Sequence, residues 1–163
     1  MALYGTTNQS AATPALTAVA GAPGKTMLQL AAQTTGIRRA WIYEYKVGPL
    51  SAPNATDCEL VWTLLKQTSA GTGGVTLTIN ALDQADSAAA TVALGNFTAE
   101  PTGADTGIVD QVPANQRGTF QWVVAPGGPG EIVIPATNLA GYGIRVRSAT
   151  YVGNAGASAK FRE

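Results

Sequence analysis

The stretch TFQWVVAPGGPGEIVIPA, residues 119–136, contains two short apolar runs separated by a corner rich in proline and glycine. Successive side chains of a strand point to opposite faces, so alternate residues share a face. One face of each run is bulky and apolar: Phe120, Trp122 and Val124 in the first, and Ile132 and Ile134 in the second. The connection APGGPG is too long and too rich in proline for a two-residue turn. The stretch therefore predicts a wide hairpin or a corner between two sheets.

The same period of two continues on both sides of this hairpin. Towards the C-terminus, GYGIRVR and GASAKFRE place Tyr142, Ile144 and Val146, and then Ala157, Ala159 and Phe161, on apolar faces. Upstream, residues 37–47 alternate between a mostly polar face and a bulky face of Ile37, Arg39, Trp41, Tyr43, Tyr45 and Val47. Residues 75–79 also alternate. Each of these segments is predicted to be a half-buried strand.

Two segments leave the choice of structure open. Residues 58–67, CELVWTLLKQ, fit a strand with Cys58, Leu60, Trp62 and Leu64 on one face, and they also fit a short helix. Turn signals about every ten residues favour the strand. Residues 81–118 are long and irregular, and they are predicted to be mostly loop, with either a helical turn or an extended excursion after Leu82.

These patterns together predict an all-β protein with one antiparallel β-sandwich domain over residues 26–163. Strands with one apolar face need a second sheet to cover them. A disulfide-linked immunoglobulin domain is excluded, because Cys58 is the only cysteine. Residues 1–25 are too poor in large apolar residues to build a core. They are predicted to form an N-terminal extension, either a frayed tail or an arm that orders on a neighbour.

The composition excludes several classes of function. Ten basic and ten acidic residues balance, whereas nucleic-acid binders usually carry a basic excess. The chain has no histidine, so the commonest metal ligand and general base are missing, and we expect no catalytic residues, metal or cofactor. No signal peptide or bilayer-spanning run is present, which indicates the cytosol or a particle assembled there. Charged residues make up only 12% of the chain, about half the usual share. Such a surface favours an oligomer or a protein partner, with a weakly charged monomer as the alternative.

The remaining polar and aromatic residues allow competing interpretations. Arg38, Arg39, Arg145 and Arg147 would form a basic patch if their strands were neighbours, and would otherwise lie on solvated sheet faces. The nearest approach to a carboxylate cluster is Asp83 and Asp86 with Asp57 and Glu59, for which turn chemistry is the better explanation. The three tryptophans, Trp41, Trp62 and Trp122, are all expected on inner faces, where core packing is favoured over ligand stacking.

The layout of the whole chain resembles small virion structural proteins of tailed bacteriophages, of the kind that decorate or cement the capsid exterior. The resemblance rests on LDQADSAAAT (82–91) with TAEPT (98–102), on FQWVVAPGG (120–128) with GEIVIPAT (130–137), and on the terminal FRE (161–163). It implies a jelly-roll-like sandwich, often a trimer, that is bound to the major capsid protein on the virion surface after assembly in the host cytoplasm.

The resemblance also implies an N-terminal arm that reaches a capsid protein or a neighbouring subunit. The candidate interface residues are Leu3, Tyr4, Leu16 and Val19 in this arm, with Arg38, Arg145 and Arg147 from the sandwich. Two other readings remain. One is a carbohydrate- or receptor-binding module of a phage tail or fibre, and the other is a hydrolase that uses carboxylates alone.

Overall fold

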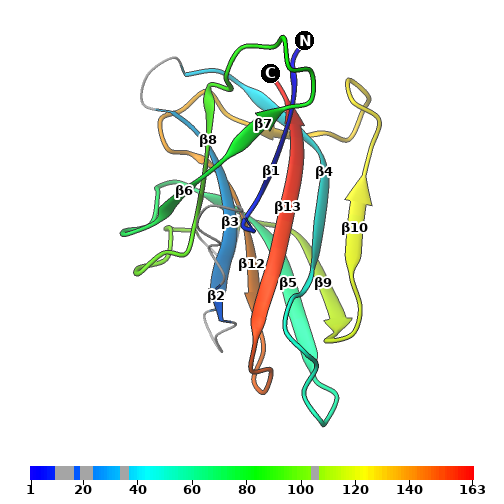
Figure 1. The fold of residues 1–163 in the computed structure, drawn as a ribbon. Helices are drawn as coiled ribbons and strands as arrows, with labels where there is room; N and C mark the ends of the chain where they lie inside the picture. Colours follow the sequence, from blue (N-terminus) through cyan, green and yellow to red (C-terminus); the bar gives the residue numbers. More distant parts are fainter. Residues whose placement is uncertain (10–16, 19–23, 34–36, 104–106) are drawn as a thin grey trace.

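The computed structural model describes residues 1–9, 17–18, 24–33, 37–103 and 107–163, which form two antiparallel sheets packed face to face (Figure 1). Sheet A contains β1 (Leu3–Thr7), β2 (Thr17–Ala18), β4 (Ala40–Pro49), β7 (Ile79–Ala81), β10 (Phe120–Val123), β11 (Ile132–Ile134) and β13 (Asn154–Arg162). Sheet B contains β3 (Lys25–Ala32), β5 (Glu59–Gln67), β6 (Val75–Leu77), β8 (Thr91–Gly95), β9 (Ile108–Asn115) and β12 (Gly141–Arg147). The prediction of an all-β sandwich is confirmed.

Strand order places different strands at the open edges of the two sheets. Sheet A runs β10-β4-β13-β1-β7, and β11 pairs with the first residues of β4 while β10 pairs with later ones. Sheet B runs β6-β8-β3-β12-β5-β9. Because a turn at residues 116–119 joins β9 directly to β10, the β9 edge of sheet B and the β10 edge of sheet A lie on the same side of the sandwich (Figure 1).

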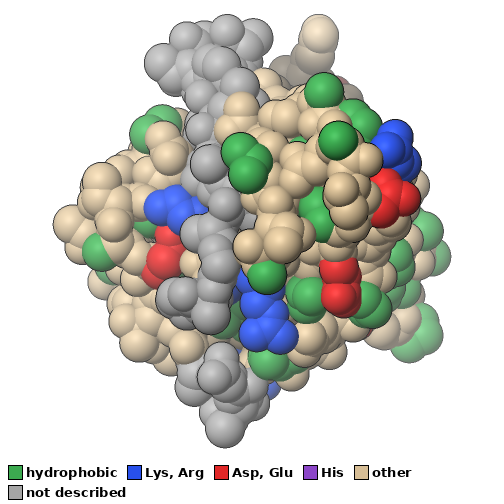
Figure 2. Space-filling view, turned by 90° about the horizontal axis from the view of Figure 1, so that it is seen from below, with side chains coloured by type: hydrophobic (Ala, Val, Ile, Leu, Met, Phe, Trp, Pro, Cys, Tyr) green, Lys and Arg blue, Asp and Glu red, His purple; other side chains and the backbone are tan. Residues whose placement is uncertain are grey.

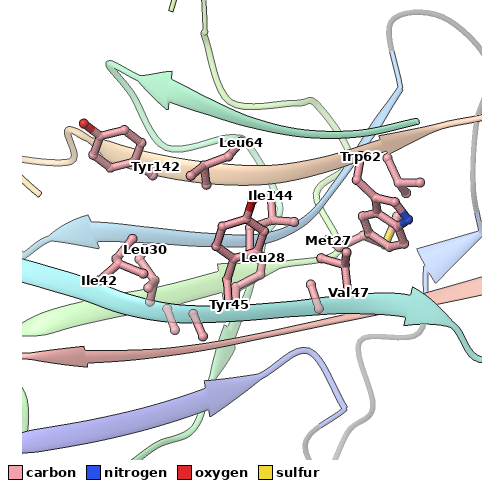
Figure 3. Close-up of a cluster of buried hydrophobic side chains, with 14 of the residues drawn as sticks. Met27, Leu28, Leu30, Ile42, Tyr45, Val47, Trp62, Leu64, Tyr142 and Ile144 are labelled. Carbon is pink, nitrogen blue, oxygen red and sulfur yellow. The ribbon is translucent and has the colours of Figure 1, made fainter. Parts of the chain in front are cut away.

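The core fills the space between the sheets with side chains from both inner faces (Figure 3). The side chains labelled there are Met27, Leu28, Leu30, Ile42, Tyr45, Val47, Trp62, Leu64, Tyr142 and Ile144, all buried. Each large apolar side chain removed from water contributes about 1.5–3 kcal/mol. The inner faces predicted for β5, β12 and β13 are confirmed, and residues 59–67 form a strand rather than a helix.

Strand β4 departs from its predicted alternation because it contains a bulge. Opposite β13, Lys160 pairs with Glu44 and Phe161 with Ile42, so Tyr43 is the extra residue. A bulge shifts the phase of the strand, so that residues before it present the opposite face from the one that period two predicts. Ile42 therefore enters the core, while Trp41 lies on the outer face beneath the Arg162 guanidinium. The prediction of an inward Trp41 is wrong.

The segment predicted as a single strand over residues 75–79 is divided between the two sheets. β6 pairs with β8 in sheet B, and β7 pairs with β1 in sheet A. The chain crosses at Thr78, whose carbonyl accepts a hydrogen bond of 2.9 Å from Thr6 Oγ1. The alternation of Val75, Leu77 and Ile79 is real, but no local signal marks the crossing.

The prediction that residues 1–25 form a free extension is wrong for the first strand. β1 lies inside sheet A, paired with β13 on one side and β7 on the other. Tyr4 is only 2% exposed and stacks on Phe161, with ring centroids 5.4 Å apart. Five residues with a single large apolar side chain on the inner face are stable here because both neighbouring strands are supplied by distant parts of the chain.

The segment 81–118, predicted to be mostly loop, contains two strands. β8 pairs with β3 and β6, and the eight-residue β9 pairs with β5 along its length. The apolar residues of β9 do not alternate, because most of this strand is exposed and has one neighbour only. Its sequence therefore lacks the periodic signal that identified the buried strands.

Candidate functional site

The surface with the strongest character of a contact site is the side of the sandwich where β9 and β10 meet. We call it the β9/β10 edge and define it by Ile108, Val109 and Pro113 on β9 with Trp122 and Val123 on β10. Val123 is 60% exposed, Val109 45% and Ile108 42%. Trp122 is half-buried and packs against the core next to Tyr45. Each of these two neighbouring edge strands thus carries exposed apolar side chains.

Backbone geometry explains how β9 remains an open edge without forming a continuous template for another strand. Gln116 N donates to Cys58 O at 3.0 Å, and hydrogen-bonded pairs alternate along an antiparallel ladder. In the register of β9 and β5, this places the backbone groups of Gln111, Pro113 and Asn115 pointing away from β5. Pro113 has no N–H, so it interrupts the outward row of donors. A partner at this edge is therefore met chiefly by side chains.

Tyr45 closes the gap between the two sheets behind this edge. Its ring stacks on Trp122 with centroids 5.5 Å apart and planes at 26°, and it also contacts Phe120 at 5.9 Å. Its hydroxyl donates a hydrogen bond to Asp110 Oδ2 on β9. Burial, followed by the hydrogen bond to Asp110, raises the pKa of Tyr45 well above its usual value, so the hydroxyl stays a neutral donor. The aromatic residues of the edge are thereby held in one orientation.

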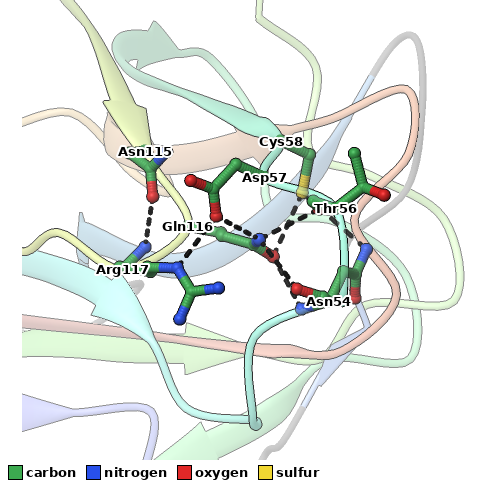
Figure 4. A network of polar contacts seen from close by, with 7 residues as sticks. All are labelled: Asn54, Thr56, Asp57, Cys58, Asn115, Gln116 and Arg117. Carbon is green, nitrogen blue, oxygen red and sulfur yellow. Dashed lines mark hydrogen bonds and ion pairs between the residues drawn. The ribbon is translucent and has the colours of Figure 1, made fainter.

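A buried polar network anchors the lower end of the edge (Figure 4). The Gln116 carboxamide Oε1 accepts from Asn54 N at 2.8 Å, and its Nε2 donates to Thr56 O at 3.1 Å and to Asp57 Oδ1 at 3.2 Å. The Cys58 thiol donates to the same Oε1 at 3.3 Å. Both polar atoms of Gln116 are satisfied within the protein, so this network holds loop 51–58 to the β9–β10 turn and has a structural role.

A groove lies on the outer face of sheet A, where Gly48 of β4 pairs with Gly156 of β13. We call it the glycine groove. The groove has a volume of about 320 Å³ and is bordered by polar groups of Thr7, Lys46 and Ser158. Side chains at the glycines would close it: a Cβ on Gly48 would lie 2.7 Å from Thr119 Cγ2, and one on Gly156 would lie 2.4 Å from Gln9 Nε2. The described lining contains no aromatic ring.

The structure separates the residues predicted to form one interface. Tyr4 is in the core, Leu3 is half-buried on the outer face of sheet A, and Leu16 and Val19 lie outside the described residues. Arg145 and Arg147 share the outer face of β12 in sheet B, whereas the exposed Arg38 precedes β4 of sheet A. Arg39 is exposed beside Arg38, so the four arginines are divided between the start of β4 in sheet A and the outer face of β12 in sheet B.

Over the described ranges, no group of three or more His, Cys, Asp or Glu side chains could hold a metal ion. Asp83 Oδ1 accepts from Ala85 N at 2.9 Å, which is the turn chemistry expected of it. Figure 2 shows the lower end of the sandwich, where charged side chains are few and form no broad patch of either sign among the coloured atoms. No helix in the described part of the chain is long and apolar enough to cross a bilayer.

Sequence reasoning missed the β9/β10 edge because residues 108–115, which form β9, are predicted to be loop. One signal was present: Pro113 within an apolar run is typical of an edge strand. Comparison with known proteins finds no family model, curated protein or solved structure that matches this chain.

Proposed function

We propose that this chain is a virion structural protein that decorates and stabilises the exterior of a phage capsid by binding the major capsid protein. A jelly-roll-like connectivity and a homotrimer are part of this proposal, as the sequence resemblance implies. The observation that carries it in the structure is the β9/β10 edge, whose apolar side chains are exposed next to aromatic rings held by Tyr45.

The edge suits a protein partner for three reasons. It exposes branched aliphatic side chains next to a half-buried tryptophan, a combination common in the centres of protein interfaces. Its aromatic groups are already fixed by Tyr45, which lowers the entropy lost on binding. Symmetric repetition over a shell would also multiply a modest contact into stable attachment.

The proposal changes the residues expected to make the contact. Tyr4 serves the core, so the N-terminal strand contributes to the fold of the sandwich rather than to a free arm. Ile108, Val109 and Val123 replace it as candidate contact residues.

The test is co-sedimentation of the purified chain with capsids assembled without it, using a charge placed in the apolar contact. Val123→Glu is expected to lower the bound fraction about tenfold at limiting concentration, since a buried unpaired carboxylate opposes association. Val152→Glu is the matched control, because Val152 is an 81% exposed valine in the β12–β13 connection, away from this edge. Circular dichroism establishes that both variants fold.

Three outcomes separate the possibilities. Saturable binding lost only in Val123→Glu supports the proposal with its contact surface. Saturable binding that both variants retain would keep the decoration role and reject the edge. Capsids that remain bare with the unaltered chain would reject the decoration role.

A second candidate, a carbohydrate- or receptor-binding module, is favoured by the glycine groove. Its volume is in the range of small-ligand sites, and Thr7, Lys46 and Ser158 could donate hydrogen bonds to hydroxyl groups. A glycan array with the unaltered chain and Gly156→Leu tests it. Binding to a defined glycan that Gly156→Leu abolishes would support this function, whereas an array without signal would reject it.

A further inference from the structure

A second packed layer covers the outer face of sheet B, on the side away from the main core. Residues 97–103, which we call the cover segment, form the outside of this layer. Thr68 N donates to Thr102 O at 3.0 Å, and Thr26 N donates to Glu100 Oε2 at 2.7 Å. A Cβ on Gly103 would lie 2.6 Å from Leu65 Cδ1, so the segment lies directly on β5. Phe97 and Leu65 are buried in this layer and are not part of the main core cluster.

Two glutamines lie under the cover segment, one on each side of β12. Gln29 of β3 is 0% exposed and Gln67 of β5 is 1% exposed. Gln29 Nε2 donates to Ser69 O at 3.0 Å, which determines the orientation of its carboxamide, because the oxygen cannot face a carbonyl. Gln29 Oε1 then has no hydrogen-bond partner among the described residues.

The Gln67 side chain occupies space that is open because Gly143 of β12 has no side chain. A Cβ on Gly143, the β12 residue opposite Gln29, would lie 2.2 Å from Gln67 Nε2 and 2.5 Å from its Oε1. The amide nitrogen makes a long hydrogen bond of 3.5 Å to Thr26 Oγ1. Gln67 Oε1, like that of Gln29, has no partner in the described part of the chain.

Three charged side chains, Lys25, Glu100 and Arg145, complete the polar groups of the layer. Glu100 Oε1 lies 3.1 Å from Lys25 Nζ as an ion pair but makes no hydrogen bond, and the guanidinium Nε of Arg145 is likewise buried without an acceptor. Arg145 pairs with Thr26 across β12 and β3, and its Nη2 donates to Pro101 O at 3.4 Å. All four buried side-chain atoms without a hydrogen bond, counted over the described residues, therefore belong to this layer.

We propose that ordered water molecules are bound under the cover segment, where they donate to Gln29 Oε1 and Gln67 Oε1. Buried polar groups of native proteins are nearly always satisfied, and enclosed waters commonly serve those that protein atoms do not reach. The chemistry selects water over an ion. Lys25 and Arg145 repel a metal cation, and an anion would be opposed by the Glu100 carboxylate and by the two unpartnered glutamine oxygens. Water both donates and accepts, so it matches the mixed set.

The test is a high-resolution crystal structure together with water–amide cross-relaxation measured by NMR. We expect a density peak at hydrogen-bond distance from each of the two glutamine oxygens, and long-lived water contacts to the side-chain amide protons of both residues. Gln116 is the internal control, because it is equally buried and its carboxamide is satisfied by protein atoms alone. Its amide protons are expected to show no such contact.

A variant tests whether the density peak depends on the acceptor oxygen of Gln67. Gln67→Met keeps the length of the side chain and removes the acceptor, so the peak next to residue 67 is expected to vanish while the one at Gln29 remains. A peak that persists next to Met at this position would overturn the assignment to Gln67. Protein atoms bonded to either glutamine oxygen, or a peak with the short, numerous oxygen contacts of a metal ion, would overturn the proposal.

Discussion

Arg162 organises the outer face of sheet A through two contacts. Its guanidinium donates to Glu131 from Nε, to Oε1 at 2.8 Å and Oε2 at 3.0 Å, and from Nη2 to Oε2 at 2.6 Å. It also lies 4.3 Å from the centroid of the Trp41 ring. The side chains of Arg162 and Glu131 are only 18% and 4% exposed. A bidentate pair protected from water in this way is stronger than a pair on the open surface.

The first prediction concerns the acid stability of this pair. The hydrogen bonds from Arg162 hold the pKa of Glu131 below its ordinary value, so the unfolded chain takes up this proton more readily than the folded one. The stabilisation is complete above the ordinary pKa and is lost as the pH falls through the lowered one. Melting temperatures measured against pH should fall in acid, and Glu131→Gln should flatten this fall. Glu59→Gln, which removes an exposed carboxylate outside this pair, is the matched control.

The second prediction concerns the hydroxyl of Tyr45. Tyr45→Phe keeps the stack on Trp122 and removes the hydrogen bond to Asp110, so we expect a loss of about 1–2 kcal/mol in the free energy of unfolding by urea. The comparison is Tyr151→Phe, whose hydroxyl makes a long contact of 3.4 Å with Asn154 O and should matter less. Equal losses in both variants would contradict the role of Tyr45 as the link between the sheets.

At the scale of the strand, substitutions in β1 test whether it is an internal strand of sheet A or a free arm. Tyr4→Ala should cost about 3–5 kcal/mol in the free energy of unfolding, because it opens a cavity beside Phe161. Leu3→Ala, on the outer face of the same strand, should cost about 1 kcal/mol. Urea denaturation measures both, and a neutral result for Tyr4→Ala would restore the free-arm interpretation.

The bulge in β4 provides the other prediction about a strand. Ile42→Ala should cost about 2–5 kcal/mol as a truncation in the core. Trp41→Ala should cost less, about 1 kcal/mol, since it removes a cation–π contact on the outer face. Chemical denaturation that ranks these variants in the opposite order would mean that the strand keeps a strict period of two.

At the scale of the whole molecule, the first and last strands lie side by side in sheet A (Figure 1). Ala2 and Glu163 exchange two backbone hydrogen bonds of 3.3 and 3.1 Å, so a short linker can join the two ends. A circular permutant with new ends between Gln84 and Ala85, in the exposed β7–β8 connection, should keep the β spectrum in circular dichroism. A permutant opened between Ala157 and Ser158, inside β13, should not fold.

The sequence by itself determined the fold class and the inner faces of β5, β12 and β13. Each of these strands has one face that is buried along its length. The period of two in the sequence identifies that face, as in Leu60, Trp62 and Leu64 or in Tyr142, Ile144 and Val146. It also determined the low share of charged residues and the absence of histidine.

Only the tertiary structure decided the rest, because the remaining features depend on pairings between distant residues. β1 is a strand because β13 and β7 provide its partners, and Trp41 faces outward because the register with β13 places a bulge at Tyr43. The β9/β10 edge lies where, among the described residues, β9 is paired with β5 alone and β10 with β4 alone. The oxygens of Gln29 and Gln67, which have no hydrogen-bond partner among the described residues, come from strands on either side of β12 for the same reason. Such positions carry no periodic signal, since burial there comes from long-range contacts.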